Sequence, residues 1–200
     1  MSEMTRHFAS NTGLVNTSAV MATTAGSQSS VRSTRMADVT LNDAEQRLAK
    51  YLAKRRHDAA RMDGIPDMKM GPQSAYDTDL EGIAAEIAFC KIMNVYPDTE
   101  IVVGNRPISD AYTTSMGSVD VKATKYRSGR LLATTKKYAK HPDSYALMVG
   151  EFPRYRFVGW VPAEELLMER NIKDLGHGEG YALDQSMLRK PEAEGDQGGR

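Results

Sequence analysis

The chain has 200 residues, and its 26 lysines and arginines balance its 26 aspartates and glutamates, so the formal net charge is zero. This length predicts one domain with terminal extensions, and the balanced charge gives no overall attraction to nucleic acid. The single cysteine, Cys90, excludes a disulfide framework and a cysteine-based zinc site. Because the sequence shows neither a run of about 18 apolar residues nor a signal segment, we expect a soluble, cytoplasmic protein with no membrane partner.

Both ends of the chain differ in composition from a folded core. Residues 1–38 are rich in Ser, Thr, Ala, Asn and Gly, and they carry too few large apolar groups to offset the entropy lost on ordering. We expect this segment to be a disordered tail and residues 191–200 to form a second one. Residues 39–190 then make up an α/β domain. Met36 is a candidate internal start that the sequence does not decide.

A helix is predicted from Thr40, because apolar positions recur at three- and four-residue steps. The expected buried stripe consists of Leu41, Ala44, Leu48, Tyr51, Leu52 and Arg55. Lys50, Lys54 and Arg56 are among the basic residues of the same helix. We interpret its basic face as solvated, with a DNA-contacting surface as the alternative.

A second helical run covers residues 80–93, with Thr78 and Asp79 as the expected N-caps. Within it, the neighbours of Glu86 at helical spacing are Gly82, Ile83, Phe89 and Cys90. A carboxylate among apolar side chains is costly, so we expect Glu86 to be paired, protonated or bound to a metal.

The segment 117–124 alternates like a β-strand. One face is expected to carry Asp120, Lys122 and Thr124, and the other Val119, Val121 and Ala123. This pattern holds a carboxylate beside an ammonium on a rigid element. It suits a site in which the carboxylate binds a divalent metal and the lysine orients or deprotonates a water. The alternative is an ion pair on the solvated face of a half-buried strand.

A third acidic residue is needed for a metal site, and two candidates precede the strand. Asp110 lies ten residues before Asp120, a spacing at which two antiparallel strands bring their ends together. Asp98 follows Pro97, in a pair that turns also use for local reasons. We favour Asp110 and keep Asp98 as the alternative.

The second half of the chain predicts further strands. The near-continuous apolar run 145–149 predicts a strand buried on both faces. Segments 129–135 and 156–161 predict two more strands, and Pro162 predicts the start of a helix. With the segment 117–124, this indicates a mixed sheet of about four to six strands.

A glutamate-bearing helix, an aspartate and then Asp120-Val121-Lys122 on an apolar strand resemble the core of the PD-(D/E)xK nuclease superfamily, particularly its small phage- or prophage-encoded members. The resemblance covers about residues 76–190 and implies a restriction-endonuclease-like α/β fold, a central mixed sheet flanked by helices. The departure lies in the motif's proline, since Pro107 stands three residues before Asp110. The implied ligands of Mg²⁺ or Mn²⁺ are Glu86, Asp110, Asp120 and the carbonyl of Val121, with Lys122 as the catalytic lysine.

The chain after Lys122 is basic and contains tyrosine, a composition suited to holding phosphates. The expected nucleic-acid contacts are Thr124, Lys125, Arg127, Lys136 and Lys137. We therefore expect a Mg²⁺- or Mn²⁺-dependent deoxyribonuclease. The alternative is a non-catalytic nucleic-acid-binding or accessory module in which the acidic cluster is structural.

Several properties stay open at the level of sequence. The resemblance is compatible with a homodimer and with phage or recombination proteins as partners. The sequence does not decide between endonuclease and exonuclease activity, or between duplex, single-stranded and branched substrates.

Overall fold

The computed structural model describes residues 38–62, 64, 74–101, 108–135, 140–176 and 178–191. All of them belong to one compact unit, Thr34–Arg200. The expected tails lie outside the described residues, apart from Asp38 and Pro191 at their inner ends. Asp38 begins the first strand, β1 (Asp38–Thr40).

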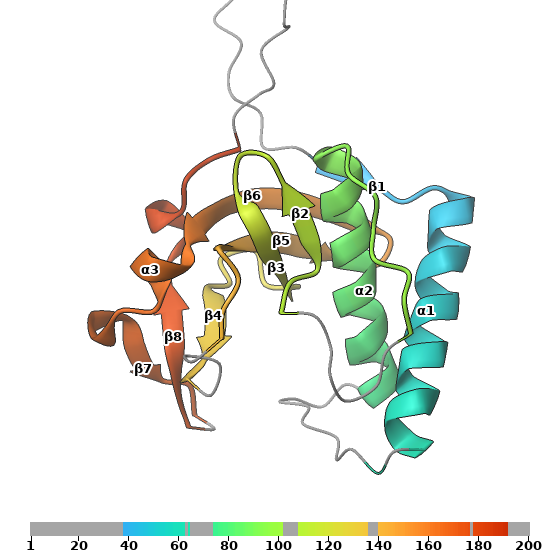
Figure 1. Ribbon diagram of the computed structural model, residues 1–200, viewed down its shortest axis with the longest axis horizontal. Helices are drawn as coiled ribbons and strands as arrows, with labels where there is room; N and C mark the ends of the chain where they lie inside the picture. Colours follow the sequence, from blue (N-terminus) through green and yellow to red (C-terminus); the bar gives the residue numbers. More distant parts are fainter. Residues whose placement is uncertain are drawn as a thin grey trace, which may run out of the picture. The chain divides into compact units, whose positions relative to one another are not determined.

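The main sheet has five strands in the order β1-β6-β5-β3-β2 (Figure 1). The other four strands are β2 (Ala111–Thr113), β3 (Gly117–Thr124), β5 (Ser144–Glu151) and β6 (Arg154–Pro162). Strands β3 and β5 run parallel, whereas every other neighbouring pair is antiparallel. The predicted α/β class with a mixed sheet is thus confirmed.

A second, three-stranded antiparallel sheet has the order β4-β8-β7. Its strands are β4 (Leu131–Thr134), β7 (Ile172–Asp174) and β8 (Glu179–Leu183). The short helices near it are α3 (Ala163–Leu166), η2 (Glu169–Asn171) and η3 (Gln185–Met187). The sequence predicts β4 as a strand, but not that it belongs to a separate sheet.

Two long helices, α1 (Asp43–Met62) and α2 (Ala75–Ile92), pack side by side (Figure 1). Helix α1 starts with a capping box, in which Asn42 Oδ1 accepts from the amides of Ala44 and Glu45 while Glu45 accepts from Asn42 N–H. Helix α2 is capped by Ser74, whose hydroxyl accepts from Asp77 N–H. The predicted caps at Thr78 and Asp79 are therefore wrong, because helix formation already begins at Ala75.

The buried face of α1 also differs from the predicted stripe. Its buried residues are Ala49, Leu52, Ala53 and Arg56. Tyr51, which the stripe includes, is 58% exposed. The face is turned because α1 packs against α2, and small alanines allow the two backbones to approach closely. Arg56, assigned by sequence to the basic face, is only 7% exposed.

Hydrophobic residues cover both faces of the main sheet. On one face, Val119, Ala146 and Phe157 pack against α2, where the rings of Phe89 and Phe157 meet edge to face at 5.3 Å. On the other face, β5 and β6 pack with α3 and with residues of β4 and β8. Strand β5 is buried on both faces, as predicted. In the part of the chain described, no helix combines the length and apolar character needed to cross a membrane.

Candidate functional site

The Asp120–Lys122 pair lies in the middle of β3, between β2 and β5. Val119 and Val121 belong to the core that faces α2, so the alternation of the strand directs Asp120 and Lys122 to the opposite face. Lys122 Nζ lies 2.8 Å from Oδ1 and 2.7 Å from Oδ2 of Asp120. Asp120 is only 5% exposed, so this is not an ion pair on a solvated strand face.

One oxygen of this carboxylate is less well bonded than the other. Asp120 Oδ1 accepts a hydrogen bond from Lys122, whereas Oδ2, although close to the same ammonium, accepts no hydrogen bond of good geometry within the described chain. A buried carboxylate oxygen without a donor is costly. Oδ2 is therefore in an ion pair with Lys122 but can still accept a well-aligned hydrogen bond.

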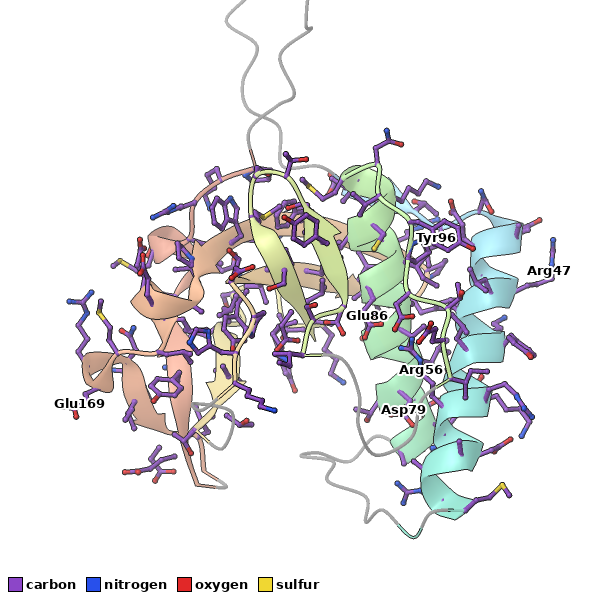
Figure 2. All side chains as sticks on the ribbon, in the orientation of Figure 1. Arg47, Arg56, Asp79, Glu86, Tyr96 and Glu169 are labelled. Atoms are coloured by element: carbon purple, nitrogen blue, oxygen red, sulfur yellow. The ribbon has the colours of Figure 1, made fainter. Side chains whose placement is uncertain are left out.

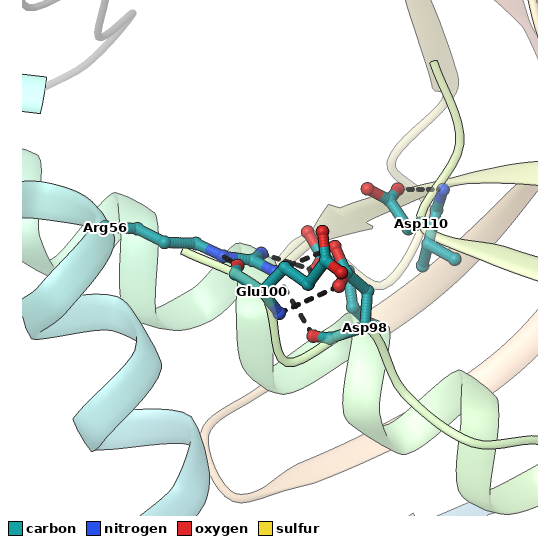
Figure 3. A network of polar contacts seen from close by, with 6 residues as sticks. Arg56, Asp98, Glu100 and Asp110 are labelled. Atoms are coloured by element: carbon teal, nitrogen blue, oxygen red, sulfur yellow. Dashed lines mark hydrogen bonds and ion pairs between the residues drawn. The ribbon is translucent and has the colours of Figure 1, made fainter. Parts of the chain in front are cut away.

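Asp110 is held at the edge of the same sheet, immediately before β2. Its N–H donates to Val119 O at 2.8 Å, and its Oδ2 accepts from Val121 N–H at 2.7 Å (Figure 3). The ten-residue spacing thus brings Asp110 next to Asp120, as the sequence predicts. Burial, followed by the negative charges of Glu86 and Asp120, raises the pKa of Asp110 to about 8. Asp110 therefore lies within electrostatic range of both other carboxylates.

Glu86 lies on α2, which covers the sheet face opposite Asp120 and Lys122, and is held by a buried arginine. Arg56 Nη1 lies 3.2 Å from Glu86 Oε2, and Figure 2 shows the two side chains in the region between α1 and α2. The same guanidinium donates to the carboxylate and carbonyl oxygens of Asp98 and to the carbonyl of Glu100, each at 3.2 Å (Figure 3). Arg56 thereby fixes both Glu86 and the segment that follows α2.

The two candidate first aspartates have different surroundings. Asp98 is bound to Arg56, and Asp110 is bound to the backbone of β3. The negative charges acting on Asp110 come from Glu86 and Asp120. The geometry therefore favours Asp110 as the partner of Asp120, whereas Asp98 helps to hold Arg56 and its loop.

Cys90 lies one helical turn after Glu86, on the buried side of α2. Burial, followed by the charges of Glu86, Asp110 and Asp98, raises the pKa of its thiol to about 12. The thiol is therefore protonated at neutral pH and is neither a nucleophile nor a metal ligand in this state.

The three carboxylates do not yet form a coordination set. Among the described residues, no group of three His, Cys, Asp or Glu side chains is arranged to hold one metal ion. Their chemistry nevertheless fits a hard divalent cation, which prefers oxygen ligands. The raised pKa of Asp110 indicates negative potential around its carboxyl that a cation would relieve.

One open pocket borders Asp110, and a second lies beyond the end of β3. One, of about 410 Å³, is lined by Asp98, Asp110 and the exposed rings of Tyr96 and Tyr112. It gives solvent and ligands access to Asp110. The other, of about 870 Å³, is lined by residues that follow β3 and by the turn between β5 and β6, including Lys125, Tyr126, Phe152 and Arg154.

The predicted nucleic-acid contacts fall into two groups. Thr124, Lys125 and Arg127 lie at or just beyond the end of β3, where Lys125 and Arg127 are exposed. Lys125 Nζ is 5.8 Å from the ring centroid of the exposed Tyr126. Lys136 and Lys137 lie outside the described residues.

Sequence reasoning missed the role of Arg56. The residue stands in a basic run, and its charge alone suggested an exposed position. A signal was present, because Arg56 lies three and four positions after Ala53 and Leu52, which are buried. A cation at the end of an apolar stripe can indicate a buried partner of opposite charge.

Comparison with known proteins adds no relative. No protein-family model matches this chain, and searches of curated proteins and of solved structures give no significant match. The roles assigned below therefore rest on the geometry of the chain itself.

Proposed function

We propose that this protein is a divalent-metal-dependent nuclease that hydrolyses phosphodiester bonds in DNA. The observation that carries the proposal is the position of Asp110, whose backbone N–H bonds to Val119 O and whose carboxylate bonds to Val121 N–H, on the strand that holds Asp120 and Lys122. Asp110 and Asp120 thus lie beside a lysine, in the chain order expected from the superfamily resemblance, and Glu86 acts on Asp110 through its charge.

In this proposal Asp110, Asp120, Glu86 and the carbonyl of Val121 hold Mg²⁺ or Mn²⁺. The bound cation would lower the pKa of a water and stabilise negative charge on the scissile phosphate. Since the carboxylates do not form a three-ligand group in this structure, binding would draw them closer together.

Lys122 has a separate role. Its Nζ is already directed at Asp120, and its remaining N–H bonds can orient the attacking water and the phosphate oxygen. Asp120 keeps the ammonium in place, because the pair is bonded and largely buried. The phosphate next to the scissile one would contact Thr124 and Lys125, two and three residues further along the chain.

The second candidate function is a non-catalytic nucleic-acid-binding or accessory module. It is favoured by the ion pairs themselves, since Arg56 and Lys122 already compensate Glu86 and Asp120 without a metal. Structural ion-pair networks shift the pKa values of their members in the same way as catalytic sites do.

One experiment separates the two functions. Plasmid and oligonucleotide DNA are incubated with the full chain in Mg²⁺, in Mn²⁺ and in chelator, and binding is measured in parallel by fluorescence anisotropy. The nuclease predicts cleavage that chelator and Asp120→Asn abolish, while Asp58→Asn, the same change at a partly exposed position on α1, preserves it. DNA binding without any cleavage by the parent in either metal would establish the accessory module instead.

A further inference from the structure

Tyr145 on β5 lies directly beside Asp120 on β3. The two residues are Cα partners in the parallel pairing of these strands. Residues opposite one another in a sheet direct their side chains to the same face. Tyr145 belongs to the core on the side of α3 and the second sheet, the face to which the alternation of β3 directs Asp120.

Each of these two buried side chains has one polar atom without a hydrogen bond of good geometry in the described chain, although both Asp120 oxygens lie within 2.8 Å of the Lys122 ammonium. Tyr145 is 1% exposed and Asp120 is 5% exposed. Within the described chain, neither the Tyr145 hydroxyl nor Asp120 Oδ2 has a hydrogen-bond partner of good geometry. Buried hydroxyls and carboxylates are almost always bonded, and exceptions call for an explanation.

The two groups are chemically complementary. Burial, then the negative charge of Asp120, then Tyr181 raise the pKa of Tyr145 to about 12. The hydroxyl therefore keeps its proton at neutral pH and can donate it, while a carboxylate oxygen can only accept. A single water between them would accept from the hydroxyl and donate to Oδ2, and such bridges are nearly as favourable as direct bonds.

From this juxtaposition we infer that Tyr145 is a positioning residue of the candidate site, and this inference rests on the proposed function. Lys122 Nζ lies within 2.8 Å of both carboxylate oxygens, and the Tyr145 hydroxyl, through a bridging water, gives Oδ2 a hydrogen bond of good geometry. The carboxylate is then restrained on both oxygens in one orientation. Groups that orient a metal ligand in this way typically change metal affinity or activity by about 10- to 100-fold when they are removed.

The chain offers a matched control in Tyr155 on β6. This tyrosine is 3% exposed, and its hydroxyl donates to Glu81 Oε2 at 2.6 Å. The Glu81 carboxylate also accepts from Phe152 N–H. The Tyr155 hydroxyl is thus bonded and has a structural role. Tyr155 pairs with Gly150 on β5, whereas Asp120 pairs with Tyr145, five residues earlier on the same strand.

The first test compares Tyr145→Phe and Tyr155→Phe in the full chain. For Tyr145→Phe we expect Mn²⁺ affinity by calorimetry and kcat for DNA cleavage to fall about 10- to 100-fold, with an unchanged or higher melting temperature. For Tyr155→Phe we expect the reverse, a lower melting temperature with unchanged affinity and kcat. Unchanged affinity and kcat in Tyr145→Phe would overturn the inference.

The second test does not depend on nuclease activity. A double-mutant cycle combines Tyr145→Phe with Asp120→Asn, and unfolding by denaturant is measured in chelator. If the hydroxyl acts on the Asp120 carboxylate, the effect of Tyr145→Phe differs between the parent and the Asp120→Asn background. Additive effects would refute the Tyr145–Asp120 link even if the protein is a nuclease. Coupling in a protein that neither binds Mn²⁺ nor cleaves DNA would retain the link and refute the proposed function.

Discussion

The guanidinium of Arg56 on α1 lies 3.2 Å from the carboxylate of Glu86 on α2, and both side chains are largely removed from water. This ion pair joins α1 to α2. Because Arg56 also binds Asp98 and the carbonyl of Glu100, one side chain connects α1, α2 and the loop that follows α2.

Arg56→Met should destabilise the protein strongly. It removes a cation with four acceptors and leaves Glu86 with one fewer compensating charge, at a cost of about 3–5 kcal/mol in the free energy of unfolding. Denaturant unfolding measures this loss. Arg55→Met is the matched control, since Arg55 is exposed and its replacement should cost less than about 0.5 kcal/mol. Equal effects of the two substitutions would show that the Arg56 network does not stabilise the fold.

Glu86→Gln should have two separable effects. In chelator it weakens the pairing with Arg56 and lowers the free energy of unfolding by about 1–2 kcal/mol. In Mg²⁺ or Mn²⁺ the parent should gain thermal stability through binding, and the variant should gain clearly less, because a hard cation requires the carboxylate charge. Melting curves with and without metal measure both effects.

The gain in thermal stability on adding metal therefore shows whether Glu86 is a metal ligand. Glu169→Gln, at an exposed position in η2 (Figure 2), should behave like the parent in both buffers. An identical gain in metal for the parent and Glu86→Gln would remove Glu86 from the ligand set.

Asp110 should make the metal-free protein less stable as the pH rises. Its pKa is raised from 3.8 to about 8, so between these values the folded protein retains a proton that the unfolded chain has released. The free energy of unfolding then decreases with pH over this interval, by at most about 1.4 kcal/mol per pH unit. Asp110→Asn should remove this contribution.

The measurement is denaturant unfolding from about pH 4.5 to pH 8 in chelator, with the difference between parent and Asp110→Asn plotted against pH. The difference should grow in favour of the variant as the pH rises. A flat difference would mean that Asp110 ionises normally and that the three carboxylates do not interact.

Lys122→Met should abolish most cleavage and also cost stability. Loss of the ammonium removes the group that orients the attacking water, an effect of about 10²–10⁴ in rate for positioned proton-handling groups. It also leaves the buried Asp120 carboxylate without its ion-pair partner, at a cost on the order of 2 kcal/mol. Single-turnover cleavage and denaturant unfolding measure the two losses. Lys54→Met, on the exposed part of α1, should change neither, and retention of the parent rate by Lys122→Met would exclude a catalytic role.

Local patterns in the sequence were sufficient for four strands, β3, β4, β5 and β6, and for one pairing of site residues, but not for β1, β7 or β8. Alternation predicts β3, and an apolar run predicts β5, because both depend on neighbouring residues. The ten-residue interval between Asp110 and Asp120 fits an antiparallel pair, and β2 pairs with β3 accordingly. These features require no knowledge of distant segments.

Other features depend on contacts that local patterns do not encode. The buried face of α1 is set by where α2 packs, so the predicted stripe included the exposed Tyr51 and omitted Arg56. The second sheet forms because Leu131 on β4 pairs with Leu183 on β8, two segments far apart in sequence. Whether Glu86 faces a metal or an arginine likewise depends on α1, thirty residues earlier.

The parallel pairing of β3 with β5 also sets an order of assembly. The contact between Arg56 and Glu86 needs only the first two helices, whereas Asp120 gains its neighbour Tyr145 after another 25 residues have been synthesised. The intervening segment includes β4, which in turn waits for β8. As the chain leaves the ribosome, Glu86, Asp110 and Asp120 are therefore synthesised before β5, the strand that pairs with β3 beside Asp120.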